Sequence, residues 1–122
     1  MPASNLSMIR KLTLAINTNG GRVLMDRVQF FSEEQGRPIT LYKVCEMVQK
    51  GDGVKKNVLF ETASQLQVVL FLRDYWFVMQ GKELPAQNNQ QWIEIREKKK
   101  FDFTEAKRLH EEIMRRREHV GT

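Results

Sequence analysis

Apolar residues recur at two different spacings along this chain, and the spacing changes from segment to segment. Near the N-terminus Leu6, Ile9 and Leu12 fit one face of a helix, while the alternation that runs on to Ile16 fits a strand equally well. We favour a helix for this segment. It ends in residues 17–21, because Asn and Gly adopt the left-handed backbone that ends helices and makes turns.

The next segment has a clearer helical repeat. Leu24, Val28 and Phe31 follow one another at intervals of four and three residues, which predicts an amphipathic helix over residues 23–35. Gly36 is the residue type expected just past the end of such a helix.

A second helix is predicted over residues 40–49, where Leu41, Val44 and Val48 repeat at three and four residues. A basic connector follows it. The connector leads to a short apolar run, residues 58–60, which can form a short strand that pairs with the later hairpin.

A third helix is predicted over residues 62–74. It opens at Thr62, which forms a capping-box pattern with Gln65. Leu66 belongs to one apolar stripe of this helix, but Phe71 on the other side is apolar too. A helix that is apolar all round is typically buried on more than one side.

Two runs with strand character follow the third helix. Residues 75–79 are rich in aromatic side chains, and residues 92–96 alternate between apolar and polar side chains. Joined by a polar loop, they are expected to form a hairpin. The chain then closes with a helix that begins at Thr104 and carries arginines near its C-terminal end.

A competing interpretation reads residues 64–80 as one unbroken helix that ends at Gly81. Leu66, Arg73 and Phe77 keep the helical spacing across it. The run at residues 92–96 then has no partner strand and the domain is mostly helical. In that case its first part, through Phe30, Phe31, Gly36, Pro38, Leu41, Tyr42 and Val44, resembles an AT-rich-interaction DNA-binding domain.

Length and composition indicate one domain: 122 residues, of which 41% are apolar and 29% charged, bury one core of modest size. The single cysteine, Cys45, cannot form an intrachain disulfide, and its position on an apolar face predicts a small buried side chain. No apolar run is long enough to span a bilayer. We therefore expect an intracellular protein, in the cytoplasm, nucleoid or nucleus, with no membrane partner.

The sequence contains no pattern that indicates catalysis. His110 and His119 have no acidic or cysteine partner at ligand spacing, so no metal site is predicted. No glycine-rich loop has the residues that bind phosphate groups. We expect a protein that is not an enzyme, with no cofactor and no small-molecule substrate. The net charge of +5 instead favours a polyanionic partner.

The order of elements over residues 23–96, three helices and then a hairpin, resembles the winged helix-turn-helix superfamily. The resemblance implies an α+β fold: a small winged helix-turn-helix domain with N-terminal and C-terminal flanking helices. The whole chain is then one domain, with a lead and helix at residues 1–21, the winged core at 22–97 and a basic C-terminal helix at 98–122.

The resemblance also implies where DNA would be contacted. The third helix would read base edges, and the polar residues on it are Ser64, Gln65, Gln67 and Arg73. Phosphate contacts would come from the basic residues and amides of the second helix, connector, hairpin and final segment, which are Arg37, Lys43, Lys50, Lys55, Lys56, Lys82, Asn88, Asn89, Lys98, Lys99 and Lys100.

The sequence thus predicts a regulatory or architectural protein that binds double-stranded DNA, with a homodimer as a further expectation because many groove-reading proteins match two half-sites. The alternative is a winged-helix module for protein–protein interaction, which would use the apolar third helix and the aromatic strand as its contact surface.

Overall fold

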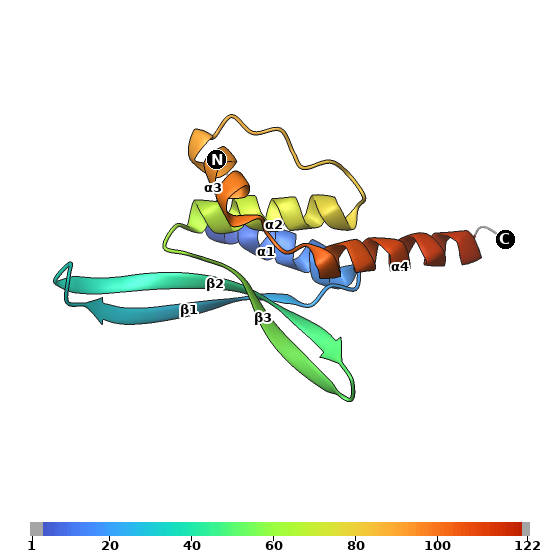
Figure 1. The fold of residues 1–122 in the computed structure, drawn as a ribbon, viewed down its shortest axis with the longest axis horizontal. Helices are drawn as coiled ribbons and strands as arrows, with labels where there is room; N and C mark the ends of the chain where they lie inside the picture. Colours follow the sequence, from blue (N-terminus) through green and yellow to red (C-terminus); the bar gives the residue numbers. More distant parts are fainter. Residues whose placement is uncertain (1–3, 121–122) are drawn as a thin grey trace.

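A computed structural model describes residues 4–120 of the chain, which form four helices and one three-stranded antiparallel sheet (Figure 1). The elements in chain order are α1 (Asn5–Thr18), β1 (Val23–Ser32), β2 (Arg37–Lys50), β3 (Gly53–Thr62), α2 (Gln65–Met79), α3 (Gln90–Lys99) and α4 (Thr104–Val120). The predicted α+β class is confirmed, and so are the first and last helices.

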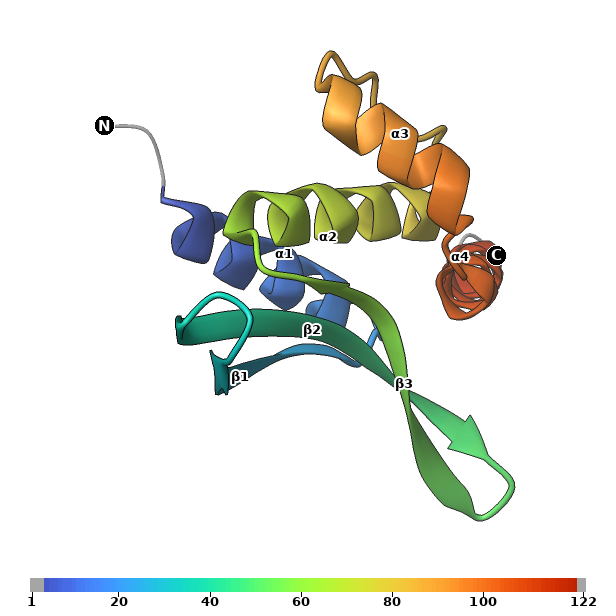
Figure 2. The same ribbon diagram turned by 60° about the vertical axis from the view of Figure 1, so that its left-hand side comes forward.

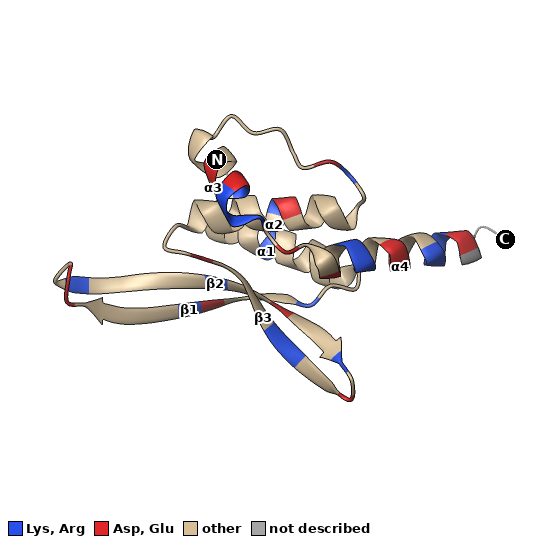
Figure 3. Ribbon diagram, viewed as in Figure 1, with Lys and Arg blue, Asp and Glu red and all other residues tan. Residues whose placement is uncertain are grey.

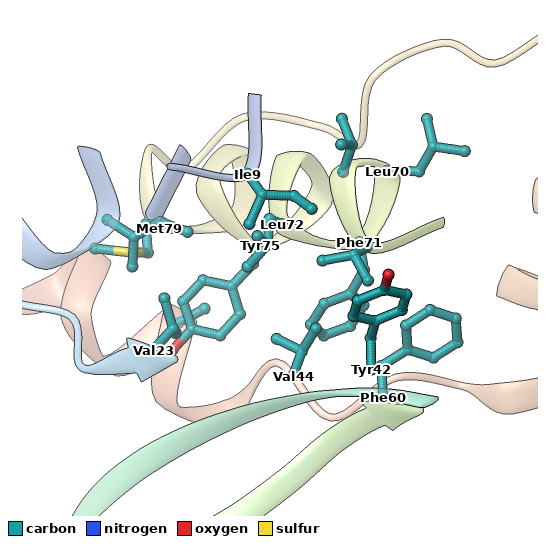
Figure 4. Packing of buried hydrophobic residues seen from close by; sticks show 14 of the residues in the cluster. Ile9, Val23, Tyr42, Val44, Phe60, Leu70, Phe71, Leu72, Tyr75 and Met79 are labelled. Carbon is teal, nitrogen blue, oxygen red and sulfur yellow. The ribbon is translucent and has the colours of Figure 1, made fainter. Parts of the chain in front are cut away.

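The helices lie on one side of the sheet, and the other side is open (Figures 1 and 2). Tyr42, Val44 and Phe60 project from the sheet toward α2 (Figure 4). The α1 and α4 helices pack against α2, whereas α3 lies beside α2 (Figure 2) and reaches the sheet through contacts of Trp92 and Lys99 with Phe60 of β3.

Aromatic rings fill the core between β3, α2 and the α3–α4 segment. The ring centroid of Phe60 lies 5.4 Å from that of Phe71 and 5.4 Å from that of Trp92, and Phe101 lies 5.0 Å from Phe71. Offset and edge-to-face pairs at such distances add to the stabilisation that comes from burying the rings. This cluster attaches α3 to the rest of the fold.

The two helices predicted over residues 23–35 and 40–49 are wrong. Both segments are strands, paired antiparallel from Val23 opposite Glu46 to Ser32 opposite Arg37. The glycine interpreted as a helix end, Gly36, has φ 64° in the turn between the two strands. That left-handed conformation suits a tight hairpin as well as a helix end.

The helical stripe of the first segment is divided between the two faces of the sheet. Leu24 and Val28 are an even number of residues apart and share the open face, whereas Phe31 lies on the opposite face, because successive strand residues alternate. The run of residues 58–60, predicted as a short strand, belongs to β3. It pairs with β2 and not with a later hairpin.

The predicted hairpin is also wrong, and the competing interpretation of residues 64–80 as one helix is confirmed. Residues 75–79 continue α2 to Met79, and residues 92–96 lie within α3. The α2 helix begins three residues later than predicted, with Ser64 as its N-cap accepting a hydrogen bond from the Gln67 N–H at 3.2 Å. The structure therefore does not confirm a winged helix-turn-helix.

The sheet has three strands only in its central part. The β3 strand pairs with β2 as far as Tyr42 opposite Thr62, so residues 28–41 form a two-stranded hairpin at one end of the sheet. Pairing of β1 with β2 stops at Glu46, so residues 47–56 form a second one at the other end. We call residues 28–41 the apolar arm and residues 47–56 the basic arm. They project beyond the helices in different directions (Figures 1 and 2).

Candidate nucleic-acid interface

The basic arm is a positively charged projection. Lys50, Lys55 and Lys56 are exposed, and Asp52 in the turn is the only acidic residue of the segment. Figure 3 shows the basic positions on β3 next to the turn. Gly51 adopts φ 59° there, which allows the tight connection between Lys50 and Gly53.

One lysine of the basic arm, Lys56, forms an ion pair. The Lys56 ammonium donates a hydrogen bond to Asp26 on β1, and this bond raises the pKa of Lys56 above its usual value. Lys43 on β2 lies 3.8 Å from Glu61 on β3. These two predicted phosphate-binding residues therefore share a cluster of mixed charge on the open face of the sheet.

Cys45 lies beneath this cluster. Its side chain has no exposed area, and its Sγ atom is 4.0 Å from Asp26 Oδ2. Burial, followed by the charge of Asp26, raises the pKa of the thiol. A thiol with a raised pKa is a poor nucleophile at neutral pH. The expectation of a small buried side chain is confirmed.

The lysines at the end of α3 lie close to β3. Lys99 Nζ is 5.3 Å from the centre of the Phe60 ring. Residues 99–102 and 58–61 line opposite sides of an open cavity of about 470 Å³, which places Lys100 there too. The lysine run Lys98–Lys100 is exposed. The structure thus brings the end of α3 beside β3, whose other half carries Lys55 and Lys56.

The residues predicted to read bases are used by the fold. Gln65 Nε2 donates to the Tyr42 hydroxyl at 2.9 Å, and Gln67 Oε1 accepts from the Thr62 hydroxyl at 2.6 Å. Ser64 is the N-cap of α2. These contacts attach the start of α2 to the sheet and leave little of these side chains for a ligand.

The other predicted residues are dispersed. Arg37 lies on the apolar arm, and Arg73 is exposed on α2. Between α2 and α3, Lys82 Nζ lies 5.7 Å from the centre of the Phe77 ring, Asn89 is the N-cap of α3, and Asn88 is exposed. None of these five side chains lies in the basic arm.

Sequence reasoning missed two buried polar clusters. In the first, Asp74 has no exposed area and accepts hydrogen bonds from Trp92 Nε1 at 3.1 Å and from Arg96 Nε and Nη2 at 2.8 and 2.6 Å. Arg96 also donates to the Pro85 carbonyl at 3.1 Å. A bidentate, fully paired carboxylate of this kind orients α3 on α2.

In the second cluster the Tyr75 hydroxyl donates to Glu46 Oε2 at 2.9 Å. Glu46 is only 2% exposed, and burial raises the pKa of its carboxyl group; burial likewise raises the pKa of Tyr75. Once residues 40–49 are recognised as a strand, Glu46 falls on the same face as Tyr42 and Val44. The sequence therefore contained this signal, but the helical interpretation concealed it.

Within residues 4–120 no group of His, Cys, Asp and Glu side chains is placed to hold a metal ion. His110 Nδ1 lies 3.1 Å from the Met79 carbonyl oxygen, and the side chain of His119 lies outside the described part of the structure. No helix in the described part combines the length and the apolar character needed to cross a bilayer.

Comparison of the chain with known protein families, curated proteins and solved structures gives no match.

Proposed function

We propose that this protein binds double-stranded DNA without chemical turnover, in a regulatory or architectural role, and that the basic arm makes the principal contact. The observation that carries the proposal is the projecting two-stranded ribbon with three exposed lysines, Lys50, Lys55 and Lys56, on a chain of net charge +5. The helix-turn-helix contact expected from the sequence has no part in it.

The shape of the arm supports a duplex partner. The major groove of B-DNA is about 12 Å wide and accepts a two-stranded β-ribbon as well as a helix. The basic arm is such a ribbon: Met47 pairs with Lys56, and Lys50 pairs with Gly53 across the turn. Met47 and Gln49 at its base line a cavity together with residues of α4, but among residues 4–120 no third strand pairs with its tip. The tip projects away from the helices (Figure 2).

The lysines supply contacts to phosphates. Lysine side chains that approach the backbone release condensed counterions, and this release dominates affinity without regard to sequence. Lys99 and Lys100 lie beside β3 and extend the positive region away from the tip. Lys50 and Lys55 make no ion pair with any described residue, so their charge is available to a partner.

The alternative surface expected from the sequence is largely buried, although Leu66 at the start of α2 is 45% exposed. Phe71, Leu72 and Tyr75, in the middle of the apolar third helix, are buried in the core. The aromatic run after them continues α2 and does not form a strand. A protein partner on that surface would first have to separate α2 from the sheet.

A salt series of fluorescence-anisotropy titrations tests the proposal, with a mixed-sequence duplex, single-stranded DNA and RNA as probes. If about five phosphates are contacted, duplex affinity falls about 10²–10³-fold between 50 and 200 mM salt. The double variant Lys50→Glu/Lys55→Glu should bind at least about tenfold more weakly, and the slope of log affinity against log salt should shrink by about 2.

The matched control is Arg10→Glu/Lys11→Glu, which makes the same change of charge at two exposed positions of α1. It should retain most of the affinity. Equal losses in the two variants would mean that only the net charge matters. No salt-sensitive binding of the duplex at 50 mM salt would contradict the proposal itself, and preferential binding of a single-stranded probe would change the class of ligand.

A further inference from the structure

The two edges of the sheet differ in their protection against pairing with another strand. Proteins protect exposed edges with lysines, bulges or covering segments. The β3 edge has all three: Lys55 and Lys56 lie on it, Leu59 is unpaired at a bulge between Phe60 and Val58, and residues 99–102 lie beside it. The β1 edge carries two charged side chains, Asp26 and Arg27, but beyond its first residue it has no lysine, bulge or covering segment in the described part of the chain.

The outward-facing backbone groups of β1 have hydrogen-bond partners only at the first residue of the strand. The Asn17 side chain accepts a hydrogen bond from the Val23 N–H at 2.8 Å and donates to the Val23 carbonyl at 3.0 Å. Alternate residues of an antiparallel strand point their backbone groups to the same side, so those of Met25, Arg27, Gln29 and Phe31 also face outward. Among residues 4–120, no hydrogen bond uses them.

This open edge is also apolar where it leaves the helices. Val28 is 38% exposed, Phe30 is 48% exposed and Phe31 is 63% exposed. All three lie on the apolar arm, which extends beyond the helical layer (Figure 1). A long, unprotected and apolar edge strand is a template for pairing with a further strand.

We propose that β1 pairs antiparallel with β1 of a second copy of the chain, across a two-fold axis at Gln29, so that two sheets join into one of six strands. This pairing does not require nucleic-acid binding. Gln29 then lies opposite its own counterpart, Arg27 lies opposite the Phe31 of the second copy, and Val28 lies opposite its Phe30.

Charge complementarity favours a second copy over an unrelated strand. In this register Arg27 of one copy lies opposite Phe31 of the other copy and diagonal to its Glu33. Glu33 is two residues beyond Phe31, just past the end of β1. The two-fold axis makes this pairing twice. Opposite charges in cross-strand or diagonal positions stabilise a sheet, and a two-fold interface of this kind closes on itself and does not propagate.

Sedimentation equilibrium of the full chain tests the proposal, and the expected result is a dimer. Arg27→Glu should raise the dimer Kd at least about tenfold, and so should Glu33→Arg, because each places like charges together. The double variant Arg27→Glu/Glu33→Arg exchanges the charges and should restore dimerisation to within a few-fold. Unfolding curves of each variant establish that the monomer remains folded.

Cross-linking tests the register. Gln29→Cys should form a disulfide between copies under mild oxidation, since residues directly opposite in a hydrogen-bonded pair have Cα atoms about 5.5 Å apart. Gln35→Cys, the same exchange at the exposed turn of the apolar arm, is the control and should remain reduced. A chain that stays monomeric at about 100 μM, a dimer unaffected by Arg27→Glu, or equal cross-linking at both positions would overturn the proposal.

Discussion

The two arms of the sheet have the same secondary structure and expose opposite chemistry. The basic arm carries three lysines against one aspartate, whereas the apolar arm carries Glu33 and Glu34 against one arginine, Arg37. The apolar arm exposes aromatic rings on both of its faces, through Phe30 and Phe31. Each arm is a two-stranded extension of a common centre.

This difference shows how one small sheet can present two surfaces. Only its central part is covered by helices, where Tyr42, Val44 and Phe60 are buried. The arms extend from this buried centre and have no core of their own. Their side chains are therefore available to contact partners. The proposals above assign a polyanion to one arm and a second copy of the chain to the other.

The largest expected effect comes from the shared centre. Phe60→Ala should lower the free energy of unfolding by about 3–5 kcal/mol, because it removes a ring from the aromatic core. Val58 lies on the opposite face of β3 because the bulge at Leu59 separates it from Phe60. Val58→Ala should therefore lower the free energy of unfolding by less than about 1 kcal/mol. Phe60 is 3% exposed and Val58 is 50% exposed. Denaturant unfolding of both variants measures the difference, and similar costs would contradict the assignment of faces in β3.

The next effect separates the arms. Lys50→Glu/Lys55→Glu should weaken duplex binding by about tenfold or more, equivalent to about 1.4 kcal/mol, and leave the dimer Kd within about twofold. Arg27→Glu should instead raise the dimer Kd at least about tenfold and leave duplex affinity within about twofold. Anisotropy and sedimentation measurements on the same preparations make the comparison. A variant that disturbs both properties would show that the arms act together.

A smaller effect is expected at Glu46, where the basic arm leaves the three-stranded centre. Burial raises the pKa of its carboxyl group in the folded state, so the folded protein binds the proton more tightly than the unfolded chain does. The contribution to stability is therefore present below the ordinary carboxyl pKa and is lost as pH rises through the raised pKa. Glu46→Gln keeps an oxygen to accept from Tyr75 and removes the charge.

The variant should accordingly gain stability relative to the natural chain as pH rises from about 4 to 7. Free energies of unfolding from urea titrations across this range measure the gain. Glu61→Gln is the control, because Glu61 is an exposed carboxylate on the same sheet. A difference that does not change with pH would indicate that Glu46 titrates normally.

The smallest effect on stability is expected at the tip of the apolar arm. Phe31→Lys should change the free energy of unfolding of the monomer by no more than about 0.5 kcal/mol, because the ring contacts little of the core. The same change gives β1 the lysine that protects other edges and should abolish the dimer. A large loss of stability at a concentration where the chain is monomeric would show that the arm packs on its own body.

Part of the fold could be read from local patterns. The first helix and the helix from Thr104 were predicted from periodicity and end signals, whereas only the competing interpretation carried α2 to its full length before Gly81. These signals act within a few residues. Cys45 was correctly expected to be buried. The lysines of the basic arm were singled out from charge, although as phosphate contacts of a different fold.

The errors at residues 23–35 and 40–49 arose because the local pattern favoured a helix. Leu24, Val28 and Phe31 satisfy a helical repeat, and a glycine follows in the expected place, so nothing within residues 23–36 excludes a helix. The reverse error occurred at residues 75–79, where aromatic side chains favour strands only weakly. Burial of Tyr75 and Met79 in the core outweighed that preference.

The sequence by itself determined the overall charge and those helices for which the apolar face and the end signals predict the same segment. Only the tertiary structure decided that residues 23–32 and 37–50 pair as strands, because the pairing joins residues such as Val23 and Glu46 that are far apart in the chain. It also placed Asp74 beside Arg96 and left one edge of the sheet open. Such long-range contacts depend on which surfaces are buried together, and no local pattern contains that information.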